Sequence, residues 1–195
     1  MALIGIVGEL GMGKTLTATY LTWRNYYYKK RRVFSNINLY GIPFTKIDSI
    51  QDFEKMKKGV FLGDELWLWI DSRCSQSVKN RVTSTILLKS RKRGLTIIYT
   101  AQAFSQIDRR VRTITDFLVY PLLNRDNTIC KAVIFRGSNP TPQSIIRTLY
   151  FRTEPIFKMY NSNEEVEPLK LEDDEPLKEI LIPIKQNPVL KEEVQ

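Results

Sequence analysis

The sequence predicts an α/β fold in which a mostly parallel central sheet is flanked by helices on both faces. Short apolar runs are typical of buried strands, helical periodicity separates several of these runs, and a glycine-rich turn follows the first one. The chain has 195 residues, of which 43% are hydrophobic, so it has enough apolar material for a buried core.

The predicted elements begin with a strand at Leu3–Val7 and a helix with apolar positions from Leu16 to Tyr27. Ser49 is expected to begin a short helix, with Asp52 completing a weak capping box. A later helix is expected from Val78 to the basic run that ends at Gly94. Further strands are predicted at residues 33–37, 59–63, 95–100, 117–120 and 129–135, with the last two joined as a hairpin.

The residue types that are missing exclude several kinds of site. There is no histidine, which rules out histidine-based catalysis and zinc sites that need an imidazole. The two cysteines, Cys74 and Cys130, are far apart, so we expect no disulfide scaffold and infer a reducing compartment. Neither a signal peptide nor an apolar run near the roughly 20 residues of a membrane span is present, so we expect a soluble intracellular protein.

A phosphate-binding loop follows the first strand. Residues 8–15 match the pattern G-x-x-x-x-G-K-[ST] in full, between a buried strand and a helix. Loop N–H groups are expected to face nucleotide phosphates, while Lys14 neutralises phosphate charge and Thr15 binds Mg²⁺. We therefore predict ATP and Mg²⁺ as cofactors, with a nucleotide site formed by Gly8, Glu9, Leu10, Gly11, Met12, Gly13, Lys14 and Thr15.

Polar side chains at the ends of two later strands are candidates for the rest of the site. Asp64 ends an apolar strand, where its carboxylate is expected to hold Mg²⁺, and Glu65 is expected to polarise an attacking water. Gln102 follows the strand at 95–100 and either senses the γ-phosphate or orients the water, or is simply a polar strand end. This combination predicts a catalytic site for hydrolysis.

Charge divides the chain into two parts. Residues 161–195 contain ten acidic and four basic residues and four of the nine prolines, whereas the first 160 residues carry a net charge of +15. We predict a P-loop ATPase domain over residues 1–160 and an acidic, proline-containing C-terminal tail over residues 161–195. A domain this basic suggests a polyanionic partner.

The motifs together resemble the FtsK–HerA superfamily of DNA-pumping ATPases. The P-loop, the strand ending in Asp64-Glu65 and the run Arg-Lys-Arg-Gly before Thr-Ala-Gln are similar to those of viral genome-packaging ATPases and zonula-occludens-toxin-like (Zot) phage ATPases. The resemblance covers residues 3–157 and implies a RecA-like core. It also implies an arginine that completes a neighbour's site, for which Arg91 is the best match, followed by Arg93 and Arg73. These arginines alternatively only complement a helix dipole.

The resemblance implies an ATP-hydrolysing motor that translocates double-stranded DNA without sequence preference and packages a viral genome into a preformed capsid. Its expected form is a homo-oligomeric ring, usually a hexamer, in the host cytoplasm and transiently at a capsid vertex, with a capsid protein as a further partner. Basic clusters at residues 29–32, 55–58, 89–93 and 109–112 are expected to contact phosphates in the channel of the ring, or are solvated surface.

Three alternatives to packaging remain. A Zot-like ATPase for virion assembly or extrusion would normally carry a membrane anchor, which the sequence does not show. A small P-loop kinase is disfavoured because Glu65 beside Asp64 suits water activation. A nucleotide-gated assembly factor would share the ATP site and would not respond to DNA.

Overall fold

The computed structural model describes residues 1–69 and 87–167. Eight strands form one sheet in the order β3-β2-β4-β5-β1-β6-β7-β8. Their bounds are β1 Leu3–Val7, β2 Arg32–Ser35, β3 Thr45–Lys46, β4 Gly59–Gly63, β5 Leu95–Ala101, β6 Phe117–Leu123, β7 Ile129–Arg136 and β8 Ile145–Arg152. The helices of the described part are α1 Lys14–Lys29, α2 Ile50–Lys55, α4 Arg109–Ile114 and α5 Glu154–Phe157, with 3₁₀ turns at Leu66–Leu68, Phe104–Gln106 and Pro142–Ser144.

The predicted mostly parallel sheet is confirmed. Strands β3, β2, β4, β5, β1 and β6 pair in parallel, and β7 and β8 extend the sheet through antiparallel pairing. The hairpin of β6 and β7 matches its prediction, and Ser49 caps α2 by accepting a hydrogen bond from the Asp52 N–H. Val78 and most of the helix predicted to follow it lie outside the described residues.

Two strands were missed in the sequence, β3 and β8. Strand β3 has only two residues, too few for any periodic pattern. In β8 the alternation of buried and exposed side chains is limited to its second half, where Leu149 and Phe151 are buried, whereas Ile145 and Ile146 are exposed. An edge strand of this kind lacks the continuous apolar run that marks the central strands.

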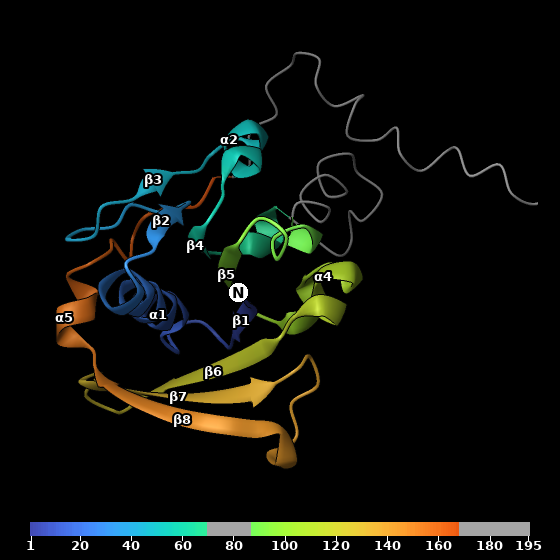
Figure 1. Ribbon diagram of the computed structural model, residues 1–195. Helices are drawn as coiled ribbons and strands as arrows, with labels where there is room; N and C mark the ends of the chain where they lie inside the picture. The colour runs from blue at the N-terminus through green and yellow to red at the C-terminus, as the bar shows by residue number, and fades with distance from the viewer. Residues whose placement is uncertain (70–86, 168–195) are drawn as a thin grey trace, which may run out of the picture.

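Helices cover both faces of the central strands (Figure 1). Helices α1 and α5 lie on one face, and α2 and α4 lie on the other. Every residue of β4 and β5 is buried, as expected for parallel strands enclosed on both sides. None of the described helices combines the length and hydrophobicity that a membrane crossing requires.

The parallel arrangement gives the sheet two different edges. Strands β1, β4 and β5 end together, with Val7 opposite Ala101 and Gly63 opposite Tyr99, and we call this the carboxyl edge. Strands β2, β4 and β5 begin together at the opposite, amino edge. Segments that follow these strands in the sequence therefore meet at the carboxyl edge, and segments that precede them meet at the amino edge.

Close packing between β1 and β5 depends on Gly5. A Cβ atom at this position would lie 2.6 Å from the Tyr99 hydroxyl oxygen and 2.7 Å from its ring carbon Cζ. Tyr99 is fully buried, and its hydroxyl forms a 2.8 Å hydrogen bond with the Thr115 hydroxyl. The tyrosine can therefore move aside only if it breaks this contact.

We predict that Gly5→Ala lowers the free energy of unfolding by about 1–3 kcal/mol, the usual cost of overpacking a core. Denaturant unfolding measures the change. In a Tyr99→Phe background the cost of Gly5→Ala is expected to be smaller, because the ring no longer forms a hydrogen bond to Thr115 and can move Cζ away from the added methyl group. An equal cost in both backgrounds would show that the Tyr99 hydroxyl does not limit the space.

Candidate functional site

The P-loop connects β1 to α1 at the carboxyl edge. Gly11 and Gly13 adopt positive φ angles of 79° and 88°, which favour glycine over residues with a side chain. Gly13 is the N-cap of α1, and a Cβ atom there would lie 3.3 Å from Cγ of Leu123. Because α1 begins at Lys14, the positive end of its dipole faces the loop, which suits an anion.

The Lys14 side chain packs against the P-loop rather than extending into solvent. Its side chain is 9% exposed, and Nζ donates a 2.9 Å hydrogen bond to the carbonyl oxygen of Glu9. Burial lowers the pKa of Lys14, while the nearby carboxylates of Asp64 and Glu65 act in the opposite direction. A charged ammonium in this partly desolvated position interacts strongly with any anion that reaches it.

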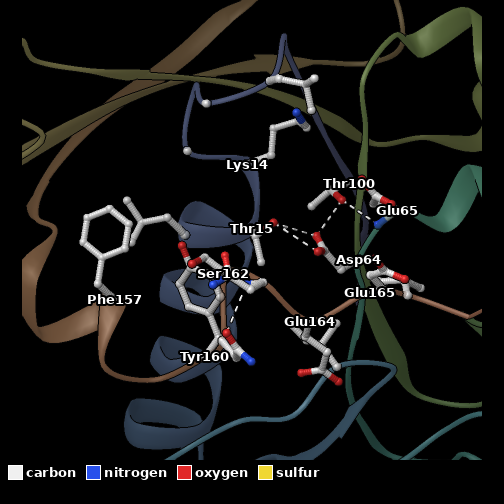
Figure 2. A pocket seen from close by; sticks show the side chains of 18 of the residues that line it. Lys14, Thr15, Asp64, Glu65, Thr100, Phe157, Tyr160, Ser162, Glu164 and Glu165 are labelled. Carbon is white, nitrogen blue, oxygen red and sulfur yellow. Dashed lines mark hydrogen bonds between the residues drawn. The ribbon is translucent and has the colours of Figure 1, made fainter.

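Asp64 lies at the centre of a hydrogen-bonded group (Figure 2). The Thr15 hydroxyl is 3.0 and 3.1 Å from its two carboxylate oxygens, and the Thr100 hydroxyl donates to Oδ1 at 2.7 Å. Burial raises the pKa of Asp64, and the two hydroxyls offset this only in part. Within the described part of the chain, no salt bridge neutralises this carboxylate.

This group has the chemistry of a divalent-cation site. Mg²⁺ prefers oxygen ligands and is usually held by one or two protein groups together with phosphates and waters. A hydroxyl of Thr15, at the start of α1, and a carboxylate of Asp64, after the end of β4, are hydrogen-bonded to each other and supply such ligands. The donor set therefore fits the predicted ion.

The backbone around Asp64 is held on both sides. The Asn36 side chain accepts from the Asp64 N–H and donates to its carbonyl oxygen, both at 2.7 Å. The Glu65 N–H donates to the Thr100 hydroxyl at 2.8 Å, so Thr100 contacts both acidic residues. Glu65 itself has a left-handed backbone with φ 45°, a conformation that costs free energy and often marks a functional position.

A cavity of about 780 Å³ opens between the P-loop and the C-terminal part of the described chain. Figure 2 shows Asp64, Glu65 and Glu165 at the right of the view and Tyr160 and Ser162 at the left, with Lys14 above them; all of these residues line the cavity. The cavity is lined by residues of the P-loop and α1, the strand ends, the β6–β7 turn and the segment after α5: Leu10, Gly11, Gly13, Lys14, Thr15, Leu16, Ile37, Asp64, Glu65, Thr100, Leu123, Asn127, Phe157 and residues 160–166.

The segment 161–167, which we call the strap, forms one wall of this cavity. Glu164 accepts hydrogen bonds from the Asn38 N–H at 2.8 Å and from its Nδ2 at 3.0 Å, and its carboxylate pairs with Lys46 Nζ at 2.8 Å. The Trp69 indole donates to the Glu167 carbonyl oxygen at 3.2 Å. The first residues of the predicted tail therefore pack on the ATPase part of the chain; the boundary at residue 160 stays a prediction.

The structure brings together most of the residues predicted for the site. Lys14, Thr15, Asp64 and Glu65 line the cavity, as do Leu10, Gly11 and Gly13, whereas Gly8, Glu9 and Met12 belong to the loop without lining it. Gln102 is half-buried just after β5 and is absent from the lining within the described residues. Its predicted role stays a prediction.

Arg91 lies far from this group in its own chain. It precedes β5, at the amino edge, and forms an ion pair with Asp116, which also accepts a hydrogen bond from the Leu3 N–H. The cavity at the carboxyl edge is thus out of its reach within one chain, and a role in a neighbour's site stays a prediction. Arg93 also lies before β5, and Arg73 lies outside the described residues.

Sequence reasoning missed Thr100, Asn36 and the strap. Thr100 carried a usable signal, since it is a polar residue next to the end of a largely apolar strand that ends beside the P-loop. Asn36 directly follows β2 and gave no comparable signal. The strap was grouped with the acidic tail because its composition resembles that of the residues after it.

Comparison with solved structures identifies the fold, while no protein-family model and no curated protein sequence matches the chain. The N-terminal domain of zonular occludens toxin from Neisseria meningitidis superposes with a TM-score of 0.63 at 19% identity, covering 82% of this chain and 98% of that one. B204, the DNA-packaging ATPase of Sulfolobus turreted icosahedral virus, superposes with a TM-score of 0.53 at 13% identity, covering 75% and 96%.

A further similar structure is the genome packaging NTPase B204 of Sulfolobus turreted icosahedral virus 2 in complex with sulfate. Its TM-score is 0.51 at 14% identity, covering 76% of this chain and 94% of that one. The expected resemblance to Zot and to viral genome-packaging ATPases is confirmed at the level of fold. The chain has the fold of a RecA-like P-loop NTPase.

Proposed function

We propose that this protein hydrolyses ATP and uses the reaction to move double-stranded DNA, packaging a viral genome into a preformed capsid. The observation that carries the proposal is the hydrogen-bonded group of Thr15, Asp64 and Thr100 beside Lys14 and Glu65, at the wall of a cavity large enough for a nucleotide. A P-loop beside a buried carboxylate is the arrangement used for phosphoryl transfer.

The residues divide the work between holding phosphate and activating water. Lys14 and the N–H groups at the start of α1 hold the β and γ phosphates by charge and hydrogen bonding. Thr15 and Asp64 would hold Mg²⁺, which would neutralise phosphate charge. Thr100 keeps the Asp64 carboxylate in place by donating to Oδ1.

Glu65 acts as the base in this proposal. Its side chain lines the cavity one residue after Asp64, and its backbone is fixed by the hydrogen bond to Thr100. A carboxylate there orients a water molecule toward the γ-phosphate and accepts its proton. Transfer to water rather than to an organic acceptor makes the reaction a hydrolysis.

Movement of DNA is supported by charge and by fold. The first 160 residues carry a net charge of +15, as expected for a protein that holds phosphate backbones without reading bases. One structure of similar fold is described as a DNA-packaging ATPase, which motivates the packaging role. We propose a ring, usually a hexamer, in the host cytoplasm and transiently at a capsid vertex, where a capsid protein is its partner.

The central test is ATP hydrolysis with and without duplex DNA. We expect DNA to stimulate phosphate release by the wild-type protein. Glu65→Gln is expected to lower kcat by about 10²–10⁴-fold while ATP binding persists, because only proton acceptance is lost. Glu154→Gln, which makes the same change at an exposed carboxylate of α5 outside the site, serves as the matched control.

The outcomes separate the candidate functions. A rate of ATP hydrolysis that does not change when duplex DNA is added would contradict the DNA motor and favour a nucleotide-gated assembly factor. Transfer of labelled phosphate to an added acceptor, with little release to water, would favour a kinase. Full activity of Glu65→Gln would remove the proposed base.

A second prediction concerns Thr100. We expect Thr100→Val to raise the Mg²⁺ concentration for half-maximal hydrolysis by about 10- to 100-fold, since the residue that orients the Asp64 carboxylate is lost. Thr100→Ser keeps the hydroxyl and is expected to behave like the wild type. If valine and serine variants show the same Mg²⁺ dependence, Thr100 does not act through Asp64.

A third prediction concerns the strap. Glu164→Ala removes its hydrogen bonds to Asn38 and its ion pair with Lys46, so the wall of the cavity loosens. We expect the KM for ATP to rise about threefold to tenfold, equivalent to roughly 0.7–1.4 kcal/mol. Glu154→Ala, which removes an ion pair with Lys158 on α5, is the matched control. Equal KM values for both variants would exclude the strap from nucleotide binding.

A further inference from the structure

Three basic segments that are distant in the sequence meet at the amino edge of the sheet, away from the cavity. Residues 29–32 lead into β2, residues 55–58 into β4 and residues 89–93 into β5. These strands are neighbours, with Arg32 opposite Gly59 and Gly59 opposite Leu95. At about 4.8 Å between adjacent strands, the three strands begin within about 10 Å of one another.

Direct contacts join these segments. The Lys58 N–H donates to the Arg93 carbonyl oxygen at 2.9 Å. Arg31 and Arg93 use guanidinium donors within the protein, on the Thr96 hydroxyl and the Glu54 carbonyl oxygen, respectively. The remaining basic side chains of the three segments are exposed, and together we call them the amino-edge surface: Lys29, Lys30, Arg32, Lys55, Lys57, Lys58, Lys89, Arg91 and Lys92.

Few carboxylates neutralise this surface. Asp52 lies 3.6 Å from Lys55 Nζ, and Asp116 pairs with Arg91. Glu54 is a third acidic residue near this surface, and it lines a shallow recess together with Lys55, Lys57 and Arg93. Among the described residues no other salt bridge reaches the amino-edge surface. Its cations therefore repel one another in the free protein.

A structural role explains only part of this charge. Lys29 and Lys30 lie at the C-terminal end of α1, where cations stabilise the helix dipole. Lys55 has the same role in the last turn of α2, whereas Arg32, Lys57 and Lys58 lie beyond the last turn of either helix. The fourth basic cluster, at residues 109–112, lies on α4, where Arg110 pairs with Asp108, and it is not part of the surface.

We propose that the amino-edge surface is the site that binds the phosphate backbone of duplex DNA. Duplex DNA carries one negative charge per about 1.7 Å of helix axis, so a dense group of exposed, largely unpaired cations is the complementary surface. The proposal rests on the proposed function, because it specifies where the motor binds duplex DNA. It places ATP and DNA at opposite edges of one sheet.

This arrangement links the two sites through the central strands. β4 starts beside the amino-edge surface and ends at Asp64, and β5 starts there and continues to Thr100. At about 3.3 Å per residue, the five residues of β4 span about 16 Å. Both strands therefore run without interruption between the amino-edge surface and the group around Asp64.

The test compares two triple variants of the full chain with the same change of charge. Arg32→Glu, Lys57→Glu and Lys92→Glu alter one exposed residue in each segment, whereas Lys131→Glu, Arg147→Glu and Arg152→Glu alter exposed residues of β7 and β8. Binding to a fluorescent duplex is measured over a salt series, with thermal unfolding as the check of folding. If a triple variant does not fold, the single charge-reversal variants at the same positions are measured instead.

We expect the amino-edge variant to bind duplex DNA more weakly. Log affinity falls as log salt concentration rises, and the steepness of this fall is expected to decrease by about 3, since each lost phosphate contact lowers it by about 1. The β7–β8 variant is expected to change the slope by less than about 1. Equal losses in the two variants, or wild-type binding by the amino-edge variant, would overturn this assignment of the surface.

Binding by the wild-type protein distinguishes failure of the proposed function from failure of the assignment of the amino-edge surface. If it binds no duplex, the DNA motor itself is contradicted, whatever the variants do. If it binds vesicles containing phosphatidylserine through the amino-edge surface instead of duplex DNA, the surface recognises an anionic membrane, and the proposal is overturned.

Discussion

The buried carboxylate of Asp64 is the group on which the arrangement of the site depends. Burying a carboxylate costs free energy unless hydrogen bonds compensate it. Here the compensation comes from Thr15 at the start of α1 and Thr100 in β5, and Asn36 after β2 holds the Asp64 backbone. Each partner comes from a different element or loop, and these meet only when β1, β2, β4 and β5 are in register.

The register of the parallel strands also places the cavity and the amino-edge surface at opposite edges of the sheet. Parallel strands place every strand end at one edge and every strand start at the other. The loop after β1 and the acidic residues after β4 therefore meet around one cavity, while the basic segments before β2, β4 and β5 form the amino-edge surface. The proposed binding of nucleotide at one edge and of DNA at the other would avoid competition between two phosphate ligands for the same cations.

Charge on the strap strengthens this separation. Glu164, Glu165 and Glu167 lie in the strap at the carboxyl edge, where their negative charge disfavours a long polyanion. A nucleotide held by Lys14 and by the proposed Mg²⁺ would be tolerated there, because its charge would be locally neutralised. Among the described residues, the acidic side chains of the strap thus lie at one edge of the sheet and the amino-edge surface lies at the other.

The sequence by itself determined the local patterns: the P-loop between a buried strand and α1, the apolar strands, and the acidic pair Asp64-Glu65. These depend on residue types at short spacing, such as glycines with positive φ before Lys14 and unbroken apolar runs in enclosed strands. Tertiary structure decided the partners of Asp64, the packing of the strap on Asn38 and Lys46, and the meeting of the basic segments. These contacts join residues dozens of positions apart, and only the strand order brings them together.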